Sequence, residues 1–312
     1  MIKTEICELL GIKYPILQGG MAWVATSELA AAVSNAGGLG IIGSGAAPRD
    51  VVQKEINRIK KLTNRPFGVN VMLMSSHVDE IIQLLYEEKV PVVTTGAGNP
   101  GKYMSRFKEI GTKVIPVVPS VALGKRMEKI GADAIIVEGT EAGGHIGELT
   151  TLSLVPQAVD EVKIPVIAAG GIADGRGLVA ALALGAKGVQ IGTRFVCTVE
   201  CQVHENYKNA IIKSSDRDAV VTGRTTGHPV RSLRNKFTKN LLELEKQNTD
   251  IDTIESFGTG MLRRAVIEGD VENGSVMAGQ ISGLIKDIKT CEQVIQDIMA
   301  EAEDVRNSIF SF

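Results

Sequence analysis

Hydrophobic and polar positions follow two alternating rhythms along the first 195 residues. Short apolar runs rich in valine and isoleucine alternate with longer stretches in which apolar residues recur every three or four positions. The first pattern predicts buried strands and the second predicts amphipathic helices, and their alternation is typical of a parallel sheet with crossover helices. The strands are predicted over residues 14–20, 38–45, 66–73, 90–98, 112–120, 132–139, 164–171 and 187–195.

Eight similar strand–helix units favour a closed barrel over a doubly wound open sheet, because polar residues and glycines follow nearly every strand. We therefore predict an α/β fold, a (β/α)₈ TIM barrel over residues 1–199 that binds the cofactor. Beyond it the rhythm changes. Residues 200–280 are predicted to form a small cap or lid with an irregular stretch over 218–237, and residues 281–312 a C-terminal helix that packs on the barrel.

Composition and charge exclude several classes of protein. The chain has 312 residues, 44% hydrophobic and 22% charged, which predicts a folded protein with a large core. A formal net charge of −2 argues against nucleic-acid binding. The apolar segments are broken before the ~20 residues that span a bilayer, and Lys3, Glu5 and Glu8 interrupt any secretory signal. We expect a cytoplasmic protein without membrane contact.

The four cysteines predict reduced thiols rather than a disulfide framework. Cys197 and Cys201 form one C-x₃-C pair, without a second pair or a histidine at zinc-finger spacing. We predict no metal site.

A phosphate site is predicted where strands seven and eight end. IAAGGIADG and QIGTRF stand there, and barrels commonly bind phosphate at this position. Without a Cβ atom, Gly170, Gly171 and Gly192 let backbone N–H groups approach phosphate oxygens, and Thr193 adds a hydroxyl donor. The alternative is that these glycines only make tight turns.

A second glycine cluster, residues 38–43, satisfies G-x-G-x-x-G, the pattern of dinucleotide-binding folds. Its context is wrong, because the glycines follow a predicted helix and lead into a strand. We predict no dinucleotide site of that type.

His145 is the candidate catalytic residue. It follows Gly143 and Gly144 after strand six, on the same side of the barrel as the predicted phosphate site. A histidine exchanges protons near neutral pH, as an acid or a base beside a reacting carbon must. His228, in the predicted lid, is a second candidate.

Other strand ends offer groups for a flat aromatic ligand. Gly20 ends strand one, and Met21 and Ala22 follow it, just before the single tryptophan. Asn70 on strand three and Gln190 on strand eight each carry a donor and an acceptor for the edge of a uracil-like ring.

With GGMAW, GVN, EGTEAGGH, AAGGIADG and QIGTRF, nearly the whole chain resembles the superfamily of FMN-dependent nitronate monooxygenases and enoyl-acyl-carrier-protein reductase II. VNVMLMS, VTTGAGNP, PVVPSVALGKRMEK, TGRTTGHPVR and SVMAGQISGL make the reductase the closer resemblance. The resemblance implies catalysis by His145 and a cofactor site formed by Gly20, Met21, Ala22, Asn70, Glu138, Gly143, Gly144, Ala169, Gly170, Gly171, Gln190, Gly192 and Thr193.

The resemblance also implies the reaction and the partners. A protein of this kind uses NADH or NADPH to reduce an enoyl substrate bound to acyl-carrier protein, in the fatty acid elongation cycle. Stimulation by a monovalent cation and assembly as a homodimer are further implications. The main alternative is a nitronate monooxygenase. Two other interpretations remain. One is a phosphate-binding barrel that works without flavin and uses a cysteine nucleophile, which a loop with His145 and no cysteine disfavours. The other is a flavin- or nucleotide-binding protein without catalytic activity.

Arg224, Arg231, Arg234 and Lys236 form a basic cluster in the predicted lid. They are either an ordinary solvated face or a contact surface for the acidic carrier protein or a dinucleotide phosphate.

Overall fold

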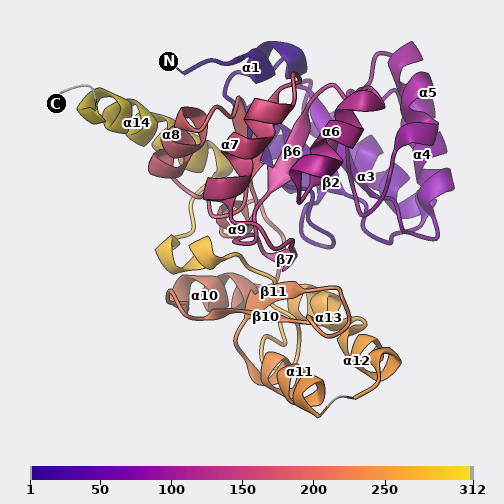
Figure 1. Ribbon diagram of the computed structural model, residues 1–312, viewed down its shortest axis with the longest axis vertical. Helices are drawn as coiled ribbons and strands as arrows, with labels where there is room; N and C mark the ends of the chain where they lie inside the picture. Colours follow the sequence, from indigo (N-terminus) through magenta and orange to yellow (C-terminus); the bar gives the residue numbers. More distant parts are fainter. Residues whose placement is uncertain (1, 248, 310–312) are drawn as a thin grey trace.

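The computed structural model describes residues 2–247 and 249–309. Figure 1 shows a barrel ringed by helices and a smaller cap at one end of it. In chain order the helices and strands are α1 (Glu5–Leu10), β1 (Ile16–Gln18), α2 (Ser27–Asn35), β2 (Gly40–Gly43), α3 (Arg49–Leu62), β3 (Phe67–Met72), α4 (Val78–Glu87), β4 (Val92–Gly96), η1 (Gly101–Tyr103), α5 (Met104–Glu109), β5 (Lys113–Val118), α6 (Val121–Lys129), β6 (Ile135–Glu138), β7 (Gly144–His145), α7 (Thr151–Glu161), β8 (Val166–Ala169), α8 (Gly175–Ala183), β9 (Gly188–Ile191), α9 (Thr193–Val196), α10 (Glu205–Lys213), β10 (Ala219–Thr222), β11 (Val230–Leu233), α11 (Lys236–Lys246), α12 (Ile251–Gly258), α13 (Met261–Glu268), η2 (Gln280–Leu284) and α14 (Cys291–Ile309).

Eight parallel strands form the barrel, in the order β1-β9-β8-β6-β5-β4-β3-β2. A bridge between Leu17 and Leu39 joins the two ends of this order. There the Gln18 N–H donates to the Leu39 carbonyl and the Leu39 N–H to the Ile16 carbonyl, each over 2.9 Å. The predicted (β/α)₈ barrel is confirmed, and all eight predicted strands are present, each shorter than predicted.

The barrel interior is packed, so a ligand can enter only at its mouth. Leu17, Ile41, Ile115 and Ile136 are fully buried in one apolar cluster inside the strands, and α1 adds Ile6 to that cluster. Helix α1 covers the end of the barrel opposite the cap (Figure 1). The carboxyl ends of the strands therefore remain as the open face.

The last helix of the ring comes from the end of the chain. Helix α14 packs against α8 and α2, and the approach to α8 is close, because a Cβ atom on Gly175 would lie 2.4 Å from the backbone nitrogen of Ala302. Figure 1 shows α14 beside α8. The division at residues 199 and 280 into separate units stays a prediction.

The cap is tied to the barrel by a three-stranded sheet, in the order β10-β11-β7. Strands β10 and β11 form an antiparallel pair, and β11 also pairs with β7, which belongs to the loop after β6. The prediction that residues 218–237 are irregular is wrong. Their strands are four residues each and are separated by a Gly- and Thr-rich turn, so they are too short for a clear alternation.

The glycines of residues 38–43 serve packing. A Cβ atom on Gly40 would lie 1.8 Å from the carbonyl oxygen of Ala30, so only glycine lets β2 lie this close to α2. This accounts for the G-x-G-x-x-G pattern without a dinucleotide. In the described part of the chain, no helix is both long and apolar enough to cross a membrane.

Candidate active site

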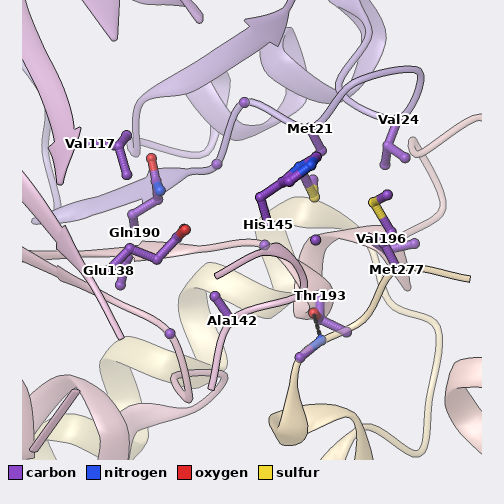
Figure 2. A pocket seen from close by; sticks show the side chains of 18 of the residues that line it. Met21, Val24, Val117, Glu138, Ala142, His145, Gln190, Thr193, Val196 and Met277 are labelled. Carbon is purple, nitrogen blue, oxygen red and sulfur yellow. Dashed lines mark hydrogen bonds between the residues drawn. The ribbon is translucent and has the colours of Figure 1, made fainter. Parts of the chain in front are cut away.

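A cavity of about 360 Å³ opens at the carboxyl ends of the barrel strands, beneath the cap. Every residue predicted for the site lines this one cavity, although the residues come from five strand ends (Figure 2). Glu138 and Gln190 lie on one side of it beside Val117, and Thr193 lies on another. The predicted site residues that line the cavity are Gly20, Met21, Ala22, Asn70, Glu138, Gly143, Gly144, His145, Ala169, Gly170, Gly171, Gln190, Gly192 and Thr193.

Backbone donors gather at the Thr193 side of the cavity. Gly170 and Gly171 have φ values of 93° and 72°, a left-handed conformation that side chains disfavour. A Cβ atom on Gly170 would also lie 2.8 Å from the Gly139 carbonyl oxygen. The Thr193 hydroxyl accepts a 3.0 Å hydrogen bond from the Gly279 N–H, which leaves its own proton available for a ligand. This arrangement suits an anion.

One carboxylate, that of Glu141, lies beside these donors, and its charge is balanced locally. The backbone N–H of Thr151, the first residue of α7, donates to both of its oxygens, over 3.0 and 2.9 Å. Positive charge at a helix N-terminus stabilises such a carboxylate. The Arg231 guanidinium is close enough to interact electrostatically with Glu141. These neighbours offset part of the negative charge that Glu141 brings to the anion site.

The loop after β1 approaches β3 closely. A Cβ atom on Gly20 would lie 2.2 Å from Cβ of Asn70, so a larger residue would displace the amide. The Asn70 Oδ1 atom accepts a 2.9 Å hydrogen bond from the Thr94 hydroxyl, which orients its NH₂ group as the remaining donor. Gln190 is buried and borders Gly19.

Glu138 ends β6 and lines the cavity without a hydrogen-bond partner in the described residues. Burial raises the pKa of its carboxyl group to about 7, and no charged neighbour contributes. Near neutral pH the group is therefore close to equally protonated and ionised. An unpaired carboxyl facing a cavity is suited to a polar atom of a ligand.

His145 is held by the cap. It forms half of β7, where it pairs with Val230 of β11, and the following N–H, of Ile146, donates to the Pro229 carbonyl over 3.1 Å. The ring is exposed at the open cavity, yet the atoms packed around it lower its pKa, and the nearby His228 lowers it further. The neutral imidazole is therefore favoured at pH 7. His228 itself does not line the cavity.

The residues that the cap adds to the cavity were not predicted from the sequence. They are mostly apolar. The Tyr207 hydroxyl donates to the Met277 carbonyl over 2.8 Å, and this bond fixes the segment that also carries Gly279. In the sequence, segment 275–284 stands out only by its family resemblance, because no periodicity marks it. The added residues are Tyr207, Leu262, Met277, Gly279 and Ile281.

Comparison with known proteins identifies the family. The family model described as nitronate monooxygenase matches residues 3–301. The chain belongs to the nitronate monooxygenase family.

Relatives within this family differ in their names. The solved structure of FabK from Thermotoga maritima is 54% identical, covers 100% of this chain and 99% of its own, and superposes with a TM-score of 0.97. A carboxyl-CoA dehydrogenase from Rhodococcus jostii is 35% identical and covers 96% of each chain. A probable nitronate monooxygenase from Staphylococcus saprophyticus is 34% identical, over 98% of this chain and 99% of its own. The chain is therefore similar to proteins named for different reactions.

None of the four cysteines lines the cavity. All four are buried and unpaired, and burial raises the pKa of Cys197 to about 12 and that of Cys201 to about 11. At these two residues thiolate is therefore negligible at neutral pH. Both observations count against a barrel with a catalytic cysteine.

Arg231 does not belong to the exposed basic cluster that was predicted. Arg231 is only 5% exposed, and it donates to the carbonyl oxygens of Thr140 and Ala219 over 3.0 and 3.3 Å. It cannot meet a carrier protein in this conformation. Arg224, Arg234 and Lys236 are exposed, and Arg224 is paired with Glu148 over 2.9 Å.

Proposed function

We propose that this protein is an FMN-dependent enoyl-acyl-carrier-protein reductase, which saturates a trans-2-enoyl thioester with NADH or NADPH. The observation that carries the proposal is the 54% identity to FabK, over the whole chain and with a TM-score of 0.97. FabK is the enoyl-acyl-carrier-protein reductase II type of this family. The probable nitronate monooxygenase relative is more distant, at 34%.

The residues present fit FMN. One phosphate group suits the donors of Gly171, Gly192 and Thr193. There is open space beside Gly192, because a Cβ atom there would have only the Met21 sulfur within 4 Å, at 3.5 Å. The NH₂ group of Asn70 and the carboxyl of Glu138 suit the polar edge of the ring system. When bound, FMN supplies reversible two-electron chemistry.

The remaining wall of the cavity suits an acyl thioester. Val24, Val117, Val196, Leu262 and Ile281 form an apolar lining, and an apolar chain gains free energy when it leaves water for such a surface. The Rhodococcus relative is named as acting on a carboxyl-CoA, another thioester. This supports a thioester substrate for the present chain.

His145 is the proposed catalytic residue. The reaction adds hydride to the β-carbon of the enoyl group and a proton to the α-carbon, while the dinucleotide is oxidised. Negative charge develops on the thioester oxygen. A neutral imidazole donates its ring N–H to that oxygen and stabilises the charge. The proton that reaches the α-carbon is supplied by solvent water, with the imidazole taking up a proton at one ring nitrogen as it gives one from the other. The lowered pKa of His145 favours this neutral form.

Two measurements test the proposal. Heat should release non-covalent FMN from the purified protein, and recovery of FAD alone would contradict the cofactor assignment. NADH or NADPH oxidation should depend on added crotonyl thioester. Dinucleotide oxidation that the thioester does not stimulate would refute the reductase assignment.

The second candidate function is nitronate oxidation, which the family model favours. Neutral His145 would then act as a base on the substrate. Oxygen uptake with an alkyl nitronate, measured on the same preparation, separates the two: the reductase assignment predicts a much lower rate with the nitronate than with the thioester.

We further expect a homodimer in the cytoplasm, stimulated by monovalent cations. The four unpaired thiols fit a reducing compartment. The other expectations rest on the resemblance alone.

A further inference from the structure

The single tryptophan of the chain stands at the rim of the cavity in an unusual conformation. Trp23 is 52% exposed and has a φ of 64°. Large side chains rarely adopt the left-handed region, and strained residues cluster at functional sites. Its sequence neighbours Ala22 and Val24 line the cavity, as does Met21, and Figure 2 shows Met21 and Val24 there.

The turn that carries Trp23 is fixed by hydrogen bonds rather than loose. The N–H groups of Val24 and Ala25 both donate to the Met21 carbonyl, over 3.2 and 2.9 Å, and the Gly43 N–H donates to the Ala25 carbonyl over 2.9 Å. These bonds hold the backbone in the strained conformation. The indole is therefore kept out of the core, where an aromatic side chain would normally pack.

The cap brings a cation to the same place. The Arg263 guanidinium of α13 lies 5.8 Å from the centre of the Trp23 ring, and the residue before it, Leu262, lines the cavity. Arg263 is also paired with Glu268 over 3.2 Å, but both side chains are more than half exposed. Exposed pairs of this kind are weak, so the guanidinium remains available to an anion.

We propose that Trp23 and Arg263 form the subsite for the adenosine phosphate part of the nicotinamide dinucleotide, an inference that rests on the proposed function. The reacting nicotinamide must enter the cavity, so the rest of the molecule extends to the rim. There the indole stacks on the adenine ring and Arg263 binds a phosphate oxygen. This gives the chain a dinucleotide site although residues 38–43 are used for packing.

The alternative ligand for this subsite is the phosphopantetheine arm of the carrier-bound substrate. That arm is a flexible chain without an aromatic ring, so a flat exposed indole offers it little. A purine ring with attached phosphates matches both members of the pair. The observations favour the dinucleotide.

Fluorescence of the single tryptophan tests the subsite directly. ADP-ribose, which lacks nicotinamide and cannot react, is titrated into the FMN-bound protein while Trp23 emission is followed. We expect saturable quenching, with a Kd about tenfold higher in Arg263→Ala. Arg264→Ala is the matched control, because Arg264 is the next residue of α13 and pairs with Asp270 instead. No quenching, or quenching by 4′-phosphopantetheine in place of ADP-ribose, would overturn the proposal.

Kinetics provide the second arm. Trp23→Ala should raise the KM for NADH or NADPH about tenfold, the usual cost of a lost base stack. Trp23→Phe, which keeps a flat ring, should have a KM for the dinucleotide close to that of the parent. The KM for crotonyl thioester should stay constant in both variants. Equal KM values for all three proteins would refute the stack. ADP-ribose binding needs no turnover, so a protein that binds it without reducing enoyl thioesters would disprove the proposed function and leave the subsite standing.

Discussion

His145 and Glu138, two of the titratable residues that line the cavity, have pKa values shifted in opposite directions by the same main cause. Burial lowers the pKa of His145 and raises that of Glu138. Both shifts favour the uncharged form, because a low-dielectric cavity penalises charge of either sign. The cavity therefore suits a largely neutral ring system and an acyl chain.

Replacing His145 with alanine should remove catalysis and spare cofactor binding. A positioned donor contributes ~10²- to 10⁴-fold in rate, so turnover of crotonyl thioester should fall by that factor in His145→Ala, while the flavin absorbance of the protein is retained. In the parent protein kcat/KM should hold between pH 7 and 8 and fall as the pH drops below the lowered pKa, since the neutral imidazole is then lost. Activity that rises on acidification would instead make the imidazolium the active form.

Glu138 should make the cofactor-free protein less stable as the pH rises. Its pKa is raised from 4.5 to about 7 on folding, so the unfolded chain ionises first. The penalty is absent below the unfolded value, grows between the two values and is complete above about pH 7. Relative to the parent, Glu138→Gln should gain ~1–3 kcal/mol in unfolding free energy between pH 5 and pH 8. Denaturant unfolding of both proteins at the two pH values measures this gain. A difference that does not change with pH would contradict the raised pKa.

At the scale of elements, the barrel half of the site could be predicted and the cap half could not. Parallel strands of a barrel present their carboxyl ends at one face, so Asn70, Glu138 and Gln190 had to converge once eight strands were recognised. Tyr207 and Met277 follow no such rule. They reach the cavity because β7 pairs with β11, a contact between segments about 85 residues apart that no local pattern announces.

A substitution at Gly143 tests how the cap segment with Ala278 and Gly279 is held against the barrel loop. A Cβ atom there would lie 2.7 Å from the backbone of Ala278 and Gly279. Gly143→Ala should push this segment away and weaken the bond from the Gly279 N–H to Thr193. Overpacking of this kind costs ~1–3 kcal/mol, so the Kd for FMN, measured by flavin fluorescence, should rise about tenfold.

Gly258→Ala is the matched control for Gly143→Ala. Gly258 lies in α12, where a Cβ atom would meet no other atom within 4 Å, and alanine favours a helix. The control should leave the Kd for FMN unchanged. An unchanged Kd in Gly143→Ala as well would show that the segment does not support the phosphate side.

At the scale of the whole molecule, two segments from the second half of the chain return to contact the barrel. Helix α14 returns to complete the ring of barrel helices, and the cap returns through β7 to position His145. The sequence indicated the first return by the amphipathic pattern of the last helix. It did not indicate the second, and this explains the error on Arg231. Side chains alternate between the two faces of a strand, and a cluster of charges in the sequence does not reveal which face the rest of the protein buries.

Arg231 is therefore expected to hold the cap to the barrel rather than to meet a partner. Arg231→Met keeps a side chain of similar length but leaves the Thr140 and Ala219 carbonyls without their donor and Glu141 without its nearby cation. Groups buried and unpaired in this way cost ~1–3 kcal/mol each, so the melting temperature should drop by several degrees. Arg234→Met, at an exposed position of the same cluster, should change stability by less than about 0.5 kcal/mol. A docking role would reverse this ranking: Arg231→Met would then melt like the parent and raise only the KM for the carrier-bound substrate.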